Sequence, residues 1–345
     1  MAAEPEGEGE MEKLLIFDAG AHPALCQTIC QLLEIEPGQA EVLEFSNGDI
    51  ANKLLSDVRG SDCFVISTQA QPVQFHIQTT LSLVKNLRIH SDGMVRLIWG
   101  YMPGIRSDKV DQLRISLGAR DMADQITAAG AHGVVILEPH FPQIVGFFDQ
   151  RLTRVEPIKT ASIFLNEIVN SGNFDLNNCV VVAADLGSAK RSGTFATRLH
   201  VELAFIDKRR NGNTETIKPV AVIGNVKGRD CLVPDDEICS GSTFIEDAIF
   251  LLENGARTVT GFMTHAPLTN LAALRKIEAI SEITGLHVTD SIPISQEKQA
   301  TCSKLRIHSV APLLAGLIRC VHERRSIHGP HGFLQSLYDK RLVKG

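Results

Sequence analysis

The sequence lacks features that mark three large classes of protein. No apolar run reaches the roughly 18 residues that a membrane-spanning helix needs. Lys and Arg number 34 against 40 Asp and Glu, whereas a nucleic-acid binder usually presents a basic surface. Residues 1–11 are rich in Glu and Gly and lack the basic-then-apolar pattern of a secretion signal. We therefore expect a cytoplasmic protein without a membrane or nucleic-acid partner, and a disordered acidic tail at residues 1–11.

The sequence also lacks any Cys-x-x-Cys pair, although it has eight cysteines. Cys26 and Cys30 are four residues apart in a helical pattern, a spacing that buried apolar positions also show. Scattered single cysteines disfavour both a disulfide framework and a zinc site. We interpret all eight cysteines as reduced thiols.

Short apolar runs alternate with helical patterns along the whole chain. The runs are nearly continuous in apolar residues, which is typical of parallel strands covered on both faces. The expected strands are residues 14–17, 42–45, 63–67, 95–99, 134–137, 179–183, 203–206, 220–223, 231–233, 258–263, 287–289 and 304–308. The expected helices include residues 23–33, 115–129, 159–169, 192–199, 244–253 and 271–283. This order predicts an α/β protein with doubly wound parallel sheets.

The length of 345 residues suggests two domains. No low-complexity linker separates the halves, so we place the boundary at a charged, proline-containing turn at residues 154–157. The expected N-terminal domain is residues 12–155, and the C-terminal domain begins at residue 156. The two halves have a similar size and rhythm of elements.

The most informative segment is residues 231–244, which read as an apolar strand, two carboxylates, a small-residue turn and a helix. The turn, residues 240–243, places backbone N–H groups and hydroxyls at a helix N-terminus, where a phosphate is stabilised. Asp235 and Asp236 lie where the strand ends, the edge at which open α/β sheets bind ligands. Simple helix capping is the alternative. The paired carboxylates favour a sugar-phosphate site.

Two further strands deliver polar side chains to loops. Asp185 follows the strand at residues 179–183 and precedes the basic pair Lys190 and Arg191. It could hold a divalent metal, or the segment could be an ordinary turn with a basic surface pair. Glu138 and His140 follow the strand at residues 134–137. Without other information, a histidine there is more often structural than a ligand.

Two charged loops complete the set. Residues 205–216 carry Lys208 and Arg210 beyond a strand, and cationic loops can close over transferring phosphates. Composition alone favours a solvated turn there. Residues 101–111 form a turn-rich charged loop that could contact nucleotide phosphates or simply be exposed.

Taken in order, these segments resemble ribose-phosphate pyrophosphokinase (phosphoribosyl pyrophosphate synthetase) over residues 14–322. Residues 140–149 are close to the family's His-x-x-Gln-Ile-x-Gly-Phe-Phe-Asp, and residues 185–191 match its Asp-x-Gly-x-Ala-Lys-Arg. Residues 208–210 match its Lys-x-Arg, and residues 45–49 its Phe-Ser-Asn-x-Glu, with Asp49 in the last place. Residues 106–114 are similar to its Arg-Gln-Asp-Lys-x-Asp region, as are Thr264, His265 and residues 291–293 to other family positions.

The resemblance implies two similar domains of phosphoribosyltransferase type I architecture, an ATP side at residues 12–155 and a ribose 5-phosphate side at residues 156–322. Residues 323–345 would form an extension outside the family pattern. It implies transfer of the β,γ-diphosphoryl group of ATP to O1 of ribose 5-phosphate, with Mg²⁺, and self-association into dimers and, as is common in the family, hexamers. The implied catalytic residues are Lys208 and Arg210, the metal residues His140 and Asp185, the ATP residues Phe45, Asn47, Asp49, Arg106 and Asp108, and the ribose 5-phosphate residues Asp235, Asp236, Cys239, Ser240, Gly241, Ser242 and Thr243.

The chain departs from the family in the ribose 5-phosphate loop, which usually reads Asp-Asp-x-x-Asp-Thr-x-Gly-Thr. Cys239 replaces the third Asp and removes a carboxylate from beneath the ribose ring. Ser240 replaces the first Thr, and Ser242 replaces a Gly whose backbone geometry a serine reaches less easily. Gly241 could supply that geometry one residue earlier.

Two alternatives to an active diphosphokinase remain. A non-catalytic, synthetase-associated regulatory subunit would typically lose the Lys-x-Arg and metal patterns, but this chain keeps Lys208, Arg210, His140 and Asp185. A phosphoribosyltransferase that consumes phosphoribosyl pyrophosphate would fit the loop after Asp235 alone. The family-like N-terminal half disfavours it, so we favour the enzyme.

Overall fold

The structure is a computed structural model that describes residues 12–110, 112–210 and 217–339; the side chains of Arg210, Ile217 and Asp339 lie outside the description. The expected tail at residues 1–11 and the loop at residues 211–216 are also outside it. The chain divides into two compact units. The first comprises Met1–Trp99, Pro103–Val135 and Gln143–Glu156, and the second comprises Gly100–Met102, Ile136–Pro142 and Pro157–Gly345.

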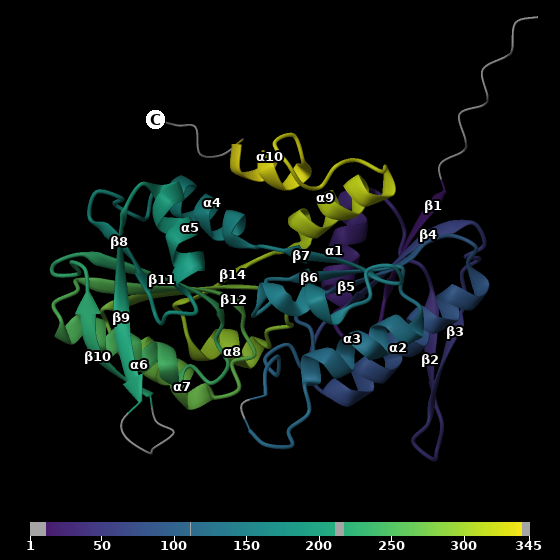
Figure 1. The fold of residues 1–345 in the computed structure, drawn as a ribbon, viewed down its shortest axis with the longest axis horizontal. Helices are drawn as coiled ribbons and strands as arrows, with labels where there is room; N and C mark the ends of the chain where they lie inside the picture. Colours follow the sequence, from purple (N-terminus) through teal and green to yellow (C-terminus); the bar gives the residue numbers. More distant parts are fainter. Residues whose placement is uncertain (1–11, 111, 211–216, 340–345) are drawn as a thin grey trace, which may run out of the picture. The chain divides into compact units, whose positions relative to one another are not determined.

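The first sheet has five strands in the order β1-β4-β5-β6-β7 (Figure 1). These strands are β1 Lys13–Asp18, β4 Ser61–Ser67, β5 Val95–Trp99, β6 Gly133–Leu137 and β7 Arg154–Ile158. β4 pairs in parallel with both β1 and β5, and all seven of its residues are buried. The continuous apolar run at residues 63–67 thus predicts a central parallel strand correctly.

Among the described residues of the first unit, the α-helices are α1 Pro23–Leu33, α2 Val73–His90 and α3 Gly118–Ala129. A short 3₁₀ helix, η1, is at Pro142–Phe147. α1 lies where the sequence predicts it and begins at a proline, which suits the first position of a helix. α2 was not among the expected helices. Thr79 and Thr80 interrupt its apolar pattern, yet both are buried and their hydroxyls donate to carbonyls four residues earlier.

Two expectations for this half are wrong. The run at residues 42–45 belongs to β2 Ala40–Glu44, which pairs antiparallel with β3 Ile50–Leu54 in a separate two-stranded hairpin. Residues 154–157, expected as a turn, lie in β7. β7 is the last strand of its sheet, and an edge strand tolerates a proline such as Pro157.

The second sheet has seven strands in the order β10-β9-β8-β11-β12-β13-β14. Their bounds are β8 Cys179–Ala183, β9 Glu202–Arg210, β10 Ile217–Ile223, β11 Asp230–Glu237, β12 Thr258–His265, β13 Ile283–Thr289 and β14 Leu305–His308. All pair in parallel except β10, which runs antiparallel to β9. A parallel strand at residues 220–223 was therefore a wrong expectation, because the short connection after β9 permits only an antiparallel return.

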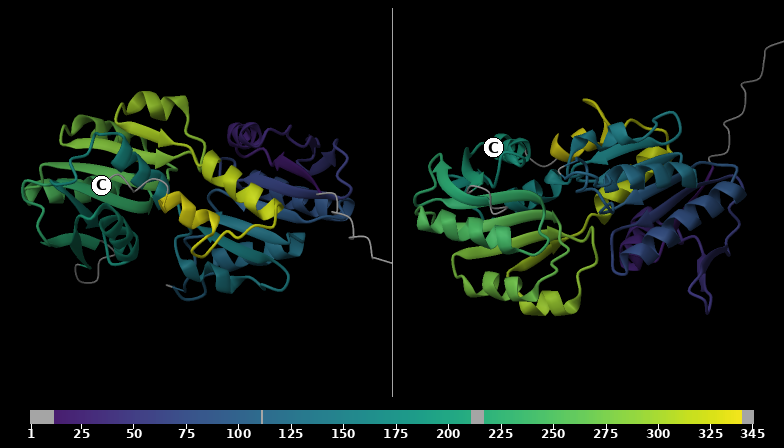
Figure 2. Two further views of the ribbon diagram at one scale, coloured as in Figure 1. Left: turned by 90° about the horizontal axis from the view of Figure 1, so that it is seen from above. Right: turned by 60° about the horizontal axis from the view of Figure 1, so that its bottom comes forward.

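Helices cover both faces of this sheet (Figures 1 and 2). α4 Ala161–Asn170 and α5 Ala189–Leu199 lie on one face, and α6 Ser242–Glu253, α7 Leu271–Ala279 and α8 Gln296–Thr301 lie on the other. Along β8, Val180 and Val182 join the core cluster under α6 and α7, whereas Cys179 and Val181 join the one under α4 and α5. This alternation confirms the doubly wound α/β prediction. The helix expected to run to residue 283 ends earlier, at Ala279.

α9 Ala311–His322 and α10 Phe333–Asp339 follow the sheet, and α10 lies in the region expected as an extension. In α10 the ring of Tyr338 lies 4.5 Å from the guanidinium carbon of Arg198 on α5. Across the described residues, no helix is long and apolar enough to cross a bilayer.

The strand order places ligand-binding side chains at one point of the second sheet. The chain leaves β8 for β9 on one side and later returns to the other side of β8 as β11. Such a reversal opens a crevice at the carboxyl ends of the two strands, where doubly wound folds bind ligands. Asp185 follows β8, and Asp235 and Asp236 lie near the end of β11.

Candidate functional site

Arg191, in the first turn of α5, lies among three carboxylates of the second unit. Its Nη1 is 2.9 Å from Oδ1 of Asp235 and 3.4 Å from Oδ1 of Asp236. Its Nε is 3.4 Å from Oε1 of Glu138, which follows β6. The Arg191 side chain is only 14% exposed. Burial would lower the pKa of its guanidinium, but the three negative charges outweigh burial and raise it.

Arg191 was not predicted as a site residue; the sequence suggested only a basic pair at the surface or near a metal loop. Nothing near it in the sequence shows that Glu138 and the Asp235–Asp236 pair converge on it, since Glu138 follows β6 and the pair lies in β11. The local signals are that Arg191 ends the family-like segment at residues 185–191 and that it lies at the start of a helix, where a cation is unfavourable for the helix dipole. A carboxylate cluster compensates for that placement.

His140 approaches the same cluster from the segment after β6. Its Nδ1 lies 2.5 Å from Oδ2 of Asp236, whose side chain is 8% exposed. Burial raises the pKa of Asp236, but the hydrogen bond with His140 and the charge of Arg191 outweigh burial and bring it below its usual range. Burial and the charge of Asp236 raise the pKa of Asp235 instead. Asp236 is therefore the carboxylate that stays ionised, whereas Asp235 takes up a proton more readily.

Two rings anchor the segments that carry these side chains. The Tyr101 hydroxyl donates to Oε2 of Glu237 at 2.5 Å, and its ring lies 4.5 Å from the ring of His265. His265 is buried, which lowers its pKa, and its Nε2 lies 3.2 Å from the carbonyl oxygens of Leu137 and Glu138. Neutral His265 thus donates from Nε2, and its Nδ1 accepts from the hydroxyl of Ser291 at 2.9 Å. These contacts attach residues 100–102 and 136–142 to β11 and β12.

The loop between β11 and α6 contains the turn that the sequence predicts to bind a phosphate, residues 240–243, which we call the cradle. Gly241 precedes the helix with φ of 84°, and a Cβ there would lie 3.1 Å from Cβ of Ala273. Ser242 is the first residue of α6 and has no positive φ. The special backbone geometry is therefore supplied by Gly241, as the sequence suggested. Ser242 and Thr243 are exposed residues at the N-terminus of a 12-residue helix, a position where backbone N–H groups and hydroxyls can bind an anion.

Hydrogen bonds within the loop fix the positions of Ser240 and Cys239. The Ser240 hydroxyl accepts from the Ser242 N–H at 3.3 Å. The Cys239 carbonyl accepts from the N–H of Thr269 at 2.8 Å, and its side chain is half-buried. This backbone hydrogen bond therefore fixes the position of Cys239. Its side chain is a thiol and so lacks the carboxylate oxygens that could accept hydrogen bonds from a sugar.

Lys208 lies in β9 rather than in a loop beyond it. Its Nζ is 2.8 Å from both carboxylate oxygens of Asp247 on α6. The side chains are 12% and 3% exposed. Burial raises the pKa of Asp247 to about 6, although the charge of Lys208 opposes this shift. Asp247 was not predicted, and Arg210 is the last residue of β9, its side chain outside the described residues.

Asp185 has the features of a magnesium ligand. It is exposed after β8, and its Oδ1 accepts from the Ser188 N–H at 2.7 Å. Within the described ranges no three His, Cys, Asp or Glu side chains converge on a metal position. Mg²⁺ is usually held by one or two carboxylates together with waters and substrate phosphates. Asp185 fits that mode, whereas His140, an imidazole already bonded to Asp236, is a less typical partner for this ion.

Three of the residues expected to bind ATP lie in the turn between β2 and β3 of the first unit. Asn47 donates from Nδ2 to Oδ2 of Asp49 at 2.6 Å, and the Asp49 N–H donates to Oδ1 of Asn47 at 3.2 Å. The Phe45 N–H donates to the Asp49 carbonyl at 2.8 Å, and the Phe45 side chain is 53% exposed. The turn is thus internally bonded and presents an open aromatic face, which suits stacking against a base.

Arg106 and Asp108 lie in the loop after β5, also in the first unit. Arg106 is exposed, and Asp108 is half-buried with one carboxylate oxygen that has no hydrogen-bond partner. Between them, Ser107 accepts at its carbonyl from the Ala119 N–H at 3.1 Å and so attaches the loop to α3.

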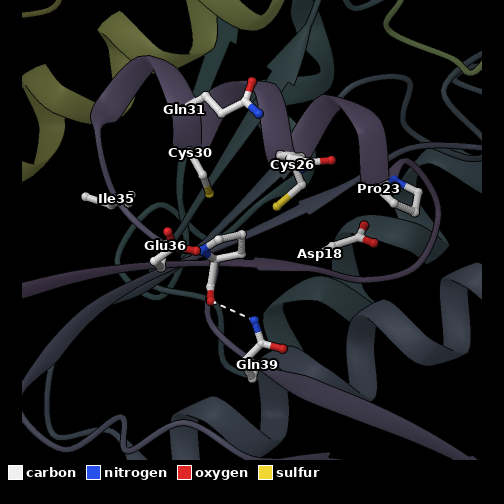
Figure 3. Close-up of a pocket in the computed structure, with 10 residues that line it drawn as sticks. Asp18, Pro23, Cys26, Cys30, Gln31, Ile35, Glu36 and Gln39 are labelled. Carbon is white, nitrogen blue, oxygen red and sulfur yellow. Dashed lines mark hydrogen bonds between the residues drawn. The ribbon is translucent and has the colours of Figure 1, made fainter.

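A cavity of about 430 Å³ lies elsewhere in the first unit, beside α1 (Figure 3). The thiols of Cys26 and Cys30 point from α1 toward it, and Asp18 and Glu36 also line it. Its ten lining residues, all within the described part of the chain, include no Lys, Arg or His, so the cavity does not suit phosphates. All eight cysteines are free, as expected, and Cys26 and Cys30 are buried.

Two sequence profiles match the chain. One describes the N-terminal domain of ribose phosphate pyrophosphokinase and matches residues 14–130, and the other describes a phosphoribosyl synthetase-associated domain and matches residues 211–329. A putative ribose-phosphate pyrophosphokinase of Streptomyces coelicolor is 32% identical, covering 92% of this chain and 97% of its own length. A ribose-phosphate pyrophosphokinase of Neisseria meningitidis is also 32% identical, with 92% and 94% covered.

A solved structure agrees with these sequence matches. The crystal structure of phosphoribosylpyrophosphate synthetase from Mycobacterium smegmatis superposes with a TM-score of 0.81 at 30% identity. The match covers 91% of this chain and 100% of that one.

Proposed function

Since this chain belongs to the ribose-phosphate pyrophosphokinase family, we propose that it transfers the β,γ-diphosphoryl group of ATP to O1 of ribose 5-phosphate, forming phosphoribosyl pyrophosphate and AMP. The observation that carries this proposal is the arrangement at the switch point of the second sheet. There, the cradle at the start of α6 follows closely on the carboxylates Asp235 and Asp236, which both form ion pairs with Arg191.

The cradle and the carboxylates suit the two ends of ribose 5-phosphate. The 5-phosphate would bind the hydroxyls of Ser242 and Thr243 and would replace the Ser240 hydroxyl as the acceptor of the Ser242 N–H, with Gly241 allowing the close approach. Asp236, ionised because of His140 and Arg191, would accept hydrogen bonds from the ribose hydroxyls. Asp235, beside it, would complete the pair, and Cys239 would lie close to the sugar without bonding it strongly.

The diphosphoryl group would be stabilised by cations. Transfer of a phosphoryl group depends mostly on positioning and on neutralising charge. Lys208 and Arg210, two residues apart in β9, would supply positive charge from the protein. Asp185, with His140 as the further candidate, would hold Mg²⁺, which neutralises phosphate charge when bound.

The first unit would provide the ATP side. Phe45 would stack on the adenine, with Asn47 and Asp49 shaping the turn, and Arg106 and Asp108 would contact the nucleotide. We also propose that the chain works in the cytoplasm and self-associates into dimers and hexamers. Sedimentation at assay concentration tests the assembly, and a fully active monomer would contradict it.

The activity is tested by incubating the protein with ATP, Mg²⁺ and ribose 5-phosphate and measuring AMP and phosphoribosyl pyrophosphate. We expect both products in equal amounts. The Lys208→Ala/Arg210→Ala variant gives the background, because it keeps the cradle but loses the cations. AMP no higher than this background would refute the diphosphokinase and favour the non-catalytic regulatory subunit.

Restoring the missing carboxylate should strengthen ribose 5-phosphate binding. In Cys239→Asp, a carboxylate would accept hydrogen bonds from the ribose, and we expect the KM for ribose 5-phosphate to fall by about fivefold, equivalent to about 1 kcal/mol. Cys239→Asn, with a similar shape but no charge, is the control. An unchanged or raised KM in the Asp variant would mean that the loop already compensates for the thiol.

A further inference from the structure

We propose that Asp247 is a positioning residue that holds Lys208 in a resting place, from which ATP must draw it before the diphosphoryl group can be transferred. This inference rests on the proposed function. It assigns a role to a carboxylate outside the residues proposed to bind ribose 5-phosphate.

The geometry is that of a closed ion pair. Nζ of Lys208 lies 2.8 Å from both oxygens of Asp247. Both side chains are almost completely buried, with 12% of Lys208 and 3% of Asp247 exposed. An ammonium group so enclosed has its charge neutralised by its partner, and water screens the pair little. In this position Lys208 presents almost no surface to a phosphate.

The pair also connects the two halves of the proposed site in the second unit. Asp247 lies on α6, five residues after Ser242, the residue that opens the cradle. Lys208 lies on β9, two residues before Arg210. The strand that delivers the cations is therefore attached to the helix that forms the sugar-phosphate cradle.

The surroundings of Asp247 favour release of the lysine once an anion competes for it. Burial raises the pKa of Asp247, and the negative charges of Asp185 and Glu246 add to that effect. Its carboxylate is thus held ionised mainly by Lys208. A polyphosphate outside the pair offers more negative charge to the ammonium group than one carboxylate does. ATP binding would then include the cost of withdrawing Lys208.

The test uses Asp247→Asn in the full chain, with steady-state kinetics at varied ATP and saturating ribose 5-phosphate. Asn keeps the shape and one acceptor but not the charge, so more of the free protein has Lys208 available. When a binding-competent state is only partly populated, the apparent affinity falls by that fraction, so we expect the KM for ATP to fall about three- to tenfold. We expect kcat and the KM for ribose 5-phosphate to change less than about twofold. Glu246→Gln, a change at the exposed neighbour, is the matched control and should leave all three constants unchanged.

Three results would overturn the proposal. An unchanged KM for ATP would make the pair merely structural. A drop in kcat of about tenfold or more would mean that Asp247 orients Lys208 for the reaction rather than restraining it. An Asp247→Ala variant with unchanged KM for ATP and unchanged kcat would also overturn the proposal. This variant replaces Asp247→Asn if Asp247→Asn does not fold.

A measurement that needs no activity separates this inference from the proposed function. Lysine acylation, followed by mass spectrometry without nucleotide, reports access to Nζ of each lysine. In the unmodified chain we expect Lys208 to react about tenfold more slowly than the exposed Lys218. In Asp247→Asn we expect the two lysines to react at similar rates. Equal rates for Lys208 in both proteins would refute the restraint even if the protein makes phosphoribosyl pyrophosphate. A faster rate in the variant with no product formed would instead refute the diphosphokinase.

Discussion

Arg191→Met is expected to lower the free energy of unfolding by about 3–5 kcal/mol, the cost of removing one partner from a buried ionic cluster. Arg191 is only 14% exposed and neutralises Glu138, Asp235 and Asp236. Methionine fills a similar volume without charge, so Glu138 and Asp236 would be left buried close to each other, with the partly exposed Asp235 beside them. His140 compensates only Asp236, and Lys159 lies 3.5 Å from Glu138. Neither can replace the shared guanidinium.

The measurement is urea denaturation followed by circular dichroism. Tryptophan fluorescence is less suitable, because the single tryptophan, Trp99, lies in the first unit, whereas Arg191 lies in the second. Arg120→Met is the control, because it breaks an exposed pair with Asp124 on α3 and should have far less effect on the free energy of unfolding. Equal effects of the two substitutions would show that the cluster is not a buried ionic centre.

The same variant should respond to pH in a defined direction. Burial raises the pKa of Glu138 and of Asp236, but Arg191 with Lys159 lowers that of Glu138, and His140 with Arg191 lowers that of Asp236, so that both fall below their ordinary values. In the parent chain these carboxylates stabilise the folded state fully when the pH is above their ordinary, unfolded-state pKa values. This stabilisation is lost as the pH falls toward and through their lowered, folded-state pKa values. Without Arg191, the clustered carboxylates take up protons in the folded state at higher pH. The difference in stability between parent and variant should therefore shrink as pH falls from 7 to 4.

The strands and the cradle could be predicted because their signals are local. The apolar run at residues 63–67 indicates a strand covered on both faces, and β4 is one. The small residues after Asp236 indicate the start of a helix. In that turn Gly241, directly before the helix, takes the left-handed conformation. Both rest on short-range sterics and on burial of contiguous side chains, which a single sequence displays.

The remaining features depend on residues far apart in the chain. Arg191 and Asp247 look like surface charges until α5 and α6 pack on the sheet and bring them to Glu138 and Lys208. α2 was missed because Thr79 and Thr80, polar in the sequence, are buried with their hydroxyls bonded within the helix. Residues 154–157 read as a turn, yet an available sheet edge makes them a strand. In each case tertiary packing outweighs local preference.

A second large effect is expected at His287, in β13 on the far side of the sheet from β9. Its ring stacks on Phe262 at 4.8 Å and on His308 at 5.1 Å, and its Nδ1 lies 2.9 Å from Nε2 of His308. Burial, followed by the charges of His308 and Arg306, lowers the pKa of His287 to about 4. Two stacked imidazoles joined by one hydrogen bond cannot both carry a proton without strong repulsion.

The sign of the pH dependence follows from where the proton goes. The unfolded chain protonates His287 near its ordinary pKa of 6.5, whereas the folded chain resists protonation down to about 4. Acid therefore favours the unfolded chain, and stability is lost as pH falls through this window and levels off below it. The lowered pKa corresponds to about 3 kcal/mol at pH 4. Burial lowers the pKa of His308 in the same direction, so it adds to the loss.

His287→Gln should remove most of this loss, because an amide keeps hydrogen-bonding groups near His308 but takes up no proton. We expect the free energy of unfolding to fall between pH 7 and pH 4 by about 3 kcal/mol less in the variant than in the parent chain. Urea denaturation at half-unit pH steps, again followed by circular dichroism, measures both profiles. His90→Gln, at an exposed position at the end of α2, is the control and should leave the profile unchanged. Parallel profiles for parent and His287→Gln would mean that the stacked pair takes up a proton without unfolding, and that acid sensitivity originates in the carboxylates around Arg191 instead.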